Sequence, residues 1–160
     1  MKEEGRMEKE YRTIRNDVAL PDQWALGKTW TRFFDGLQEG RIWGTKCIPC
    51  GKVFVPARPF CPECLKDMTQ WVEVGQEGKI LTWTLVQAEY VGQIHPPPYI
   101  IALIQLAGAD CGFSHFIGGI DLTDIKKVKQ KLKTGTKVRA VWRSEKKADI
   151  HDIAYFAPVK

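Results

Sequence analysis

The sequence predicts a mainly β protein with an N-terminal helix, in which a small cysteine-bound ribbon precedes a five-stranded barrel. Three observations predict this class: an apolar stripe of helical period near the start, two cysteine pairs in the middle, and short β-type runs from Gly78 onward. The 160 residues, 44% of them hydrophobic and 27% charged, are enough for a modest core. Folds that need about 250 residues, such as a TIM barrel, are excluded unless another chain supplies the rest.

The first 17 residues are predicted to form a flexible or partner-ordered arm. They carry five basic and five acidic residues and almost no apolar ones, so they cannot bury enough surface to offset the entropy of ordering. The sequence contains no apolar run of the length of a signal peptide or a membrane span. We therefore expect a cytoplasmic protein with no membrane association, whose thiols stay reduced and available to a metal ion.

Residues 18–40 are predicted to hold the helix, over Trp24 to Leu37. Its apolar residues recur at i, i+4, i+7, i+8 and i+11, the stripe of an amphipathic helix, and they are Leu26, Trp30, Phe33, Phe34 and Leu37. Gly40 follows as a helix stop.

Residues 41–75 are predicted to form a rubredoxin-like zinc ribbon, because they contain two CxxC pairs. The pairs are Cys47 with Cys50 and Cys61 with Cys64. Each pair presents two thiolates from a tight turn, and two pairs complete the tetrahedral set that zinc prefers. Gly51 suits the first turn, whereas Leu65 stands where glycine is usual in the second.

A zinc ion held by all four cysteines leaves no open coordination position, so we expect a structural and not a catalytic Zn²⁺. Free buried thiols or an iron–sulfur centre are the alternative interpretations of the same residues. A ribbon of this size has little core of its own, and we expect metal removal to unfold residues 42–74 and largely spare the barrel.

Residues 76–160 are predicted to form the barrel. Its five candidate strands are Lys79–Gln87, Tyr99–Leu106, Gly112–Ile120, Lys137–Ser144 and Ile150–Phe156. Tyr99–Leu106 is nearly all apolar, which suggests a strand buried on both faces. A helical or turn-rich connector, Asp121 to Lys133, separates the third strand from the fourth. Five strands with this insertion are the order of an OB-fold, and an SH3-like barrel is the main alternative.

The positive charge behind the net +5 is concentrated in one region of the sequence. The window from Asp124 to Lys147 holds ten basic and two acidic residues, whereas the rest of the chain holds 14 basic and 17 acidic ones. This window suggests an anionic partner or ligand without naming it.

No catalytic motif such as HExxH, GxSxG or GxGxxG occurs in the sequence. Cys111, the fifth cysteine, is interpreted as a loop or partly buried thiol. Among the three histidines, His95 precedes three prolines and an aromatic residue, a stiff segment suited to a partner.

The segments TRFFDGLQEGRIWGTKC and CIPCGKVFVPARPFCPEC, followed by an all-β region, resemble the zinc-ribbon/OB-fold family of acyl-CoA-associated proteins. The resemblance covers residues 26–158 and is most specific from Phe33 to Cys64. It implies a small non-catalytic accessory subunit that docks on a thiolase-superfamily enzyme in a hetero-oligomer and helps to shape or close the acyl-CoA tunnel. The narrower resemblance is to the accessory subunit of 2-benzoylsuccinyl-CoA thiolase, in anaerobic aromatic degradation.

A coenzyme A thioester would then be a ligand shared by the complex, and cations near the tunnel would suit its phosphates. The candidates are Arg58 in the ribbon and Lys137, Arg139 and Arg143 on the fourth strand. Strand alternation places these three cations on one face and Trp142 on the other. A merely solvated strand face is the competing interpretation.

Zinc ribbons and OB-folds also bind nucleic acids, so a single-strand-binding protein is the alternative function. Such proteins place aromatic residues among the exposed cations. Because Trp142 is predicted to face the core, opposite Arg139 and Arg143, the accessory role is preferred and nucleic-acid binding is not expected.

Overall fold

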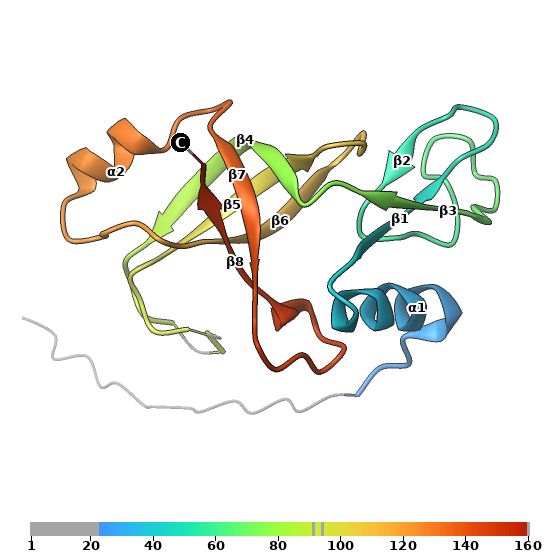
Figure 1. Cartoon of the computed structure of the whole chain (residues 1–160), viewed down its shortest axis with the longest axis horizontal. Coiled ribbons are helices and arrows are strands. Elements are labelled where there is room, and N and C mark those ends of the chain that lie inside the picture. Colours follow the sequence, from blue (N-terminus) through green and yellow to red (C-terminus); the bar gives the residue numbers. More distant parts are fainter. Residues whose placement is uncertain (1–22, 91, 94, 160) are drawn as a thin grey trace, which may run out of the picture.

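A computed structural model describes residues 23–90, 92–93 and 95–159, so the predicted arm at 1–17 and the start of the helical segment lie outside the described residues. A three-stranded ribbon with its helix occupies one end of the molecule, and a barrel occupies the other (Figure 1). In the described part of the chain, no helix is long and apolar enough to cross a membrane.

Helix α1 spans Gly27–Gln38, so it begins three residues later than predicted. Leu26 precedes it without a side-chain cap, and Gly27 has a φ of +63°. Phe33 and Leu37 of the predicted stripe are fully buried. The amide of Gly40, at φ +78°, bonds to the Leu37 carbonyl and ends the helix where the sequence predicted.

The ribbon sheet contains β1 (Ile42–Lys46), β2 (Val53–Phe54) and β3 (Gln70–Val74), in the order β2-β1-β3 with antiparallel pairing. Helix α1 packs on β1, and Gly36 is required there because a Cβ at this position would run into the Trp43 ring. Buried Thr45 ties β1 to the loop after β2, since its hydroxyl donates to the Arg58 carbonyl at 2.9 Å and accepts from the Arg58 amide at 2.8 Å.

The barrel is closed by five strands in the order β4-β5-β6-β8-β7. They are β4 (Glu77–Val86), β5 (Tyr99–Leu106), β6 (Gly112–Ile117), β7 (Lys137–Trp142) and β8 (Ile153–Pro158). Helix α2 (Ile125–Lys131), capped by the Asp124 carboxylate, lies between the third and fourth of these strands, which confirms the predicted OB order.

Two strand predictions need correction. The prediction that Tyr99–Leu106 is buried on both faces is wrong, because β5 alternates between an inward face with Ile100 and Ile104 and an outward face with exposed Leu103. In a small closed barrel only one face of each strand lines the core. The last strand also starts later than predicted, because the carboxylates of Asp149 and Asp152 form a capping box that makes residues 150–152 a 3₁₀ turn.

One apolar cluster runs from the helix and ribbon into the barrel. It joins Phe33, Ile42 and Val74 to barrel residues such as Ile80 and Phe156, and all five are buried. The ribbon sheet and the barrel therefore share a core, and only the cysteine end of the ribbon lies in a separate cluster.

Candidate metal centre

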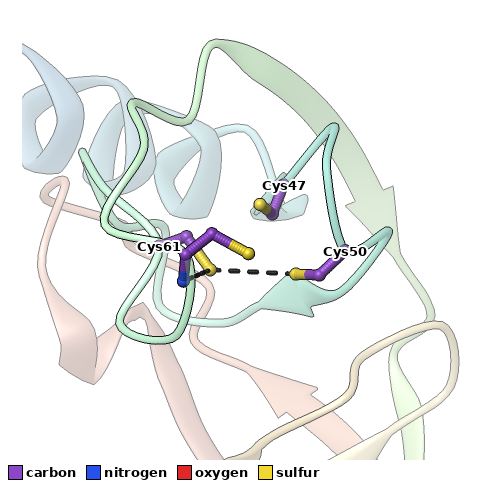
Figure 2. Close-up of side chains that lie close together, drawn as sticks. Cys47, Cys50 and Cys61 are labelled. Atoms are coloured by element: carbon purple, nitrogen blue, oxygen red, sulfur yellow. Dashed lines mark hydrogen bonds between the residues drawn. The ribbon is translucent and has the colours of Figure 1, made fainter.

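Four cysteines meet at the end of the ribbon. The Sγ atoms of Cys47, Cys50, Cys61 and Cys64 all lie within 4.8 Å of one another. Figure 2 shows Cys47, Cys50 and Cys61 around this point, with 3.8 Å between the sulfurs of Cys50 and Cys61. A tetrahedral ion with Zn–S bonds of about 2.3 Å needs S···S edges of about 3.8 Å. The thiols present therefore fit a four-coordinate zinc ion without rearrangement of the fold.

The two turns that carry these thiols are built alike. In the first, the Cys47 amide bonds to Lys52 O and the Gly51 amide to Cys47 O, both at 2.8 Å. In the second, the Cys61 amide bonds to Lys66 O at 2.8 Å and the Leu65 amide to Cys61 O at 2.9 Å. We call these turns, residues 47–52 and 61–66, the two knuckles.

The pKa values of the thiols indicate that the four cysteines ionise together only when a cation is bound. Hydrogen bonding to Cys50, together with burial, raises the pKa of Cys64 to about 12. Burial also acts against ionisation of Cys61, but amide donors from Cys64 and Glu63 outweigh it and lower the pKa of Cys61 to about 7. Without a metal ion the cluster thus resists carrying several negative charges at once, whereas a divalent soft cation would let all four thiols ionise.

Cys111 lies outside the four-thiol set but touches the same cluster. Its Sγ accepts from the Val55 amide at 3.1 Å and donates to the Val55 carbonyl at 3.2 Å. Next to it, Asp110 exchanges two bonds with Val53: its amide donates to Val53 O at 2.9 Å, and its carboxylate accepts from the Val53 amide at 2.8 Å. These bonds join the ribbon to the start of β6, a link that sequence reasoning missed because the paired residues are more than 50 positions apart.

The four cations predicted to contact coenzyme A are exposed, and the structure does not bring them together. The Arg58 guanidinium lies 5.4 Å from the centre of the Phe54 ring, and Arg139 forms an ion pair with Glu77 on β4. Lys137 lines a cavity of about 390 Å³ at the ribbon side of the barrel. Arg143 lines a different cavity, of about 290 Å³, beside residues 144–152.

Strand β7 alternates as predicted, with Val138 and Ala140 buried and Lys137 and Arg139 exposed. Trp142 is half-buried against the core, and its indole N–H donates to the Gln76 side chain at 2.9 Å. Its ring is therefore not a free stacking platform among the cations.

All three histidines lie close together at one end of the barrel, an arrangement that could not be predicted from their positions in the sequence. His95, from the β4–β5 connection, meets the Phe116 ring edge-on at 4.8 Å between centroids, and His151 stacks on the same ring at 6.4 Å. Buried His115 bonds through Nε2 to Ile150 O at 3.2 Å, while its buried Nδ1 has no partner among the residues that the structure describes. Burial lowers the pKa of His115 from its ordinary value. Only the OB strand order brings these three segments together.

The ribbon, its four thiols and the closed barrel define a class of protein, a zinc ribbon joined to an OB-fold. Two family patterns match in the same order: the ChsH2 rubredoxin-like zinc ribbon domain over residues 34–69 and the ChsH2 C-terminal OB-fold domain over residues 71–143. Together these stretches hold more than half of the chain, which therefore belongs to the ChsH2 (DUF35) family of zinc-ribbon and OB-fold proteins.

Relatives with similar sequences are described as DUF35 domain-containing scaffold proteins. One from Pyrococcus furiosus is 28% identical over 124 residues, which cover 78% of this chain and 82% of the relative. One from Methanothermobacter thermautotrophicus is 30% identical over 70 residues, covering 43% of this chain and 53% of the relative.

Two solved structures share the fold. A DUF35 protein of unknown function from Sulfolobus solfataricus aligns with a TM-score of 0.56 and 28% identity, covering 72% of this chain and 78% of the other. The Ltp2-ChsH2(DUF35) aldolase aligns with a TM-score of 0.60 and 20% identity, covering 85% and 98%, and at that identity it supports the fold alone.

Proposed function

We propose that the chain is a non-catalytic, zinc-binding accessory subunit of a thiolase-fold acyl-CoA enzyme. The observation that carries this proposal is the match of both domains, in order, to a family whose relatives are described as scaffold proteins. A solved structure of the same fold is that of the Ltp2-ChsH2(DUF35) aldolase. The subunit docks on its partner and helps to shape or close the tunnel that holds the acyl-CoA.

The metal centre supports a structural role in this assembly. Four thiolates fill the tetrahedral shell of a zinc ion, which leaves no position for a substrate or a water nucleophile. With an ion bound by Cys47, Cys50, Cys61 and Cys64, the two knuckles would be held at a fixed separation and orientation. Chemistry on the thioester is then left to the partner, and this chain contributes surface and position.

Coenzyme contacts are a further part of the proposal. Lys137 and Arg143 are exposed, and in the described ranges neither forms an ion pair, so both are free to meet a phosphate. Arg139 would have to leave Glu77, and Arg58 would have to leave the Phe54 ring. We therefore rank Lys137 and Arg143 first among the four candidate contacts.

The narrower proposal concerns the substrate. The basic C-terminal half of the chain resembles that of the accessory subunit of 2-benzoylsuccinyl-CoA thiolase, so we propose an aromatic acyl-CoA in anaerobic aromatic degradation. Comparing the turnover of 2-benzoylsuccinyl-CoA with that of aliphatic thioesters by the assembled complex tests this step.

Co-expression with a tagged candidate thiolase-fold enzyme, followed by gel filtration and metal analysis, tests the proposed function. We expect the two chains to elute together, with zinc in the fraction that contains this chain. Elution of the chain alone with every candidate, combined with strongly salt-dependent binding to single-stranded oligonucleotides, would favour the nucleic-acid alternative instead.

A further inference from the structure

Three large apolar side chains are exposed at the cysteine end of the ribbon. Ile48 lies inside the first knuckle and is 70% exposed, Leu65 ends the second knuckle and is 77% exposed, and Phe60, just before Cys61, is 54% exposed. Each of the three residues is next to a cysteine of the four-thiol cluster in the chain, so all three lie at the same end of the molecule. We call Ile48, Phe60 and Leu65 the knuckle face.

Leu65 shows that this face is not required by the fold. It occupies the same place in its knuckle as Gly51 does in the first: each follows the second cysteine, and the amide of each bonds to the carbonyl of the first cysteine. Both have left-handed backbone, at φ +54° for Leu65 and +75° for Gly51. Glycine adopts this conformation without cost, whereas a leucine is strained there. A side chain that is both strained and exposed gains nothing from folding, which points to a role outside the chain.

The metal ligands themselves are incompletely covered at this end. Cys47 and Cys61 are fully buried, but Cys64 is only half-buried and Cys50 is exposed. A protein seated on the knuckle face would bury apolar area and also shield these two sulfurs from water and oxidants.

The charges around the face indicate what such a partner presents. From residue 46 to residue 67 the chain has four basic and two acidic residues. Lys52 pairs with Glu63 across the knuckles, so the remaining excess is positive, with Arg58 and Lys66 both exposed. A complementary surface has an apolar depression with aspartate or glutamate at its rim.

We propose that the thiolase-fold partner binds the knuckle face through such an apolar depression with an acidic rim, with Leu65 as a central contact. This inference rests on the proposed function and adds to it the surface through which the two proteins meet. Nucleic acid is disfavoured as the occupant, because the face is apolar at its centre and carries only a small excess of cations.

Leu65→Gly tests this interface directly. It removes the exposed side chain and introduces the residue found at the equivalent position of the first knuckle, Gly51. We expect zinc content and thermal unfolding temperature to match or exceed those of the wild type. The affinity for the co-purifying thiolase-fold enzyme, measured by titration calorimetry, is expected to fall by about tenfold or more, as for truncation of a central interface residue. Ile48→Ser, which leaves the backbone of the second knuckle untouched, serves as a second variant if Leu65→Gly loses zinc.

Leu103→Ser is the matched control, since Leu103 is an exposed leucine on the outer face of the barrel. It is expected to leave the affinity unchanged. Wild-type affinity in both Leu65→Gly and Ile48→Ser would overturn the inference, and so would a self-association of the chain alone that Leu65→Gly abolishes. A wild-type chain that binds no thiolase-fold enzyme would instead refute the proposed function.

Discussion

Removal of the metal ion is expected to unfold the two knuckles and to leave the barrel folded. Apart from two of the ligands, the buried residues of the cluster at this end are, in the described part of the chain, Phe54 and Met68. Burying two such side chains contributes about 3–6 kcal/mol, which is less than the about 10–16 kcal/mol that structural zinc supplies in small four-ligand sites. The knuckles therefore depend on the ion.

The structure narrows the set of residues that should unfold when the metal ion is removed. Ile42 and Val74 belong to the core shared with the barrel, so β1 and β3 keep most of their burial when the ion leaves. Val53, Val55 and Ala57, between the knuckles, belong to the same shared core, so the region expected to unfold narrows from residues 42–74 to the two knuckles themselves.

Amide hydrogen exchange resolved by residue measures this response. In the chelated protein, the amides of Gly51 and Leu65, which close the knuckle turns, should lose protection by about a hundredfold or more, equivalent to about 3 kcal/mol of local stability. Amides in β5 and β6 should change little. Knuckle amides that stay protected in a sample verified to be free of metal would refute the reasoning.

Three further perturbations test the packing that positions the site. Asp110→Ala leaves the buried Val53 amide without its acceptor and should lower the free energy of unfolding by about 1–3 kcal/mol in urea titrations, whereas an unchanged midpoint would show that the ribbon–barrel link is dispensable. Gly36→Ala places a methyl group against the Trp43 ring and should cost about 1–3 kcal/mol through overpacking; a stabilised variant would contradict the helix placement. Burial lowers the pKa of His115 below its ordinary 6.5, so near this pH the folded state binds fewer protons than the unfolded chain. The free energy of unfolding should therefore be at its full value above pH 6.5 and should decline as the pH falls through 6.5 toward the folded pKa. His115→Gln should flatten this dependence, and an unchanged slope would assign it to other groups.

Features set by local spacing could be predicted from the sequence. The two CxxC pairs specify their own turns, because each knuckle closes through bonds within a few residues, and the stripe of α1 correctly placed Phe33 and Leu37 in the core. The alternation of β7 likewise separated Val138 from Arg139. In each case the controlling interaction lies within one element.

Features that depend on strand order could not be predicted in this way. The apolar run of β5 gave no sign that Leu103 faces outward, because both faces of the strand carry similar residues. The bonds from Asp110 to Val53 and the meeting of His95 with His151 require the closed barrel and its junction with the ribbon. The exposure of Leu65 follows from the left-handed turn, although its place in the CxxC pattern already set it apart from Gly51.

Turnover of the thiolase-fold partner, titrated with this purified chain, tests the central claim most directly. The accessory role predicts that the partner alone is poorly active or insoluble, and that thioester turnover rises with added chain until a fixed stoichiometry is reached. The zinc-depleted chain should give a much smaller rise. A partner that is soluble and fully active by itself, with a rate that does not change on adding the chain, would contradict the account.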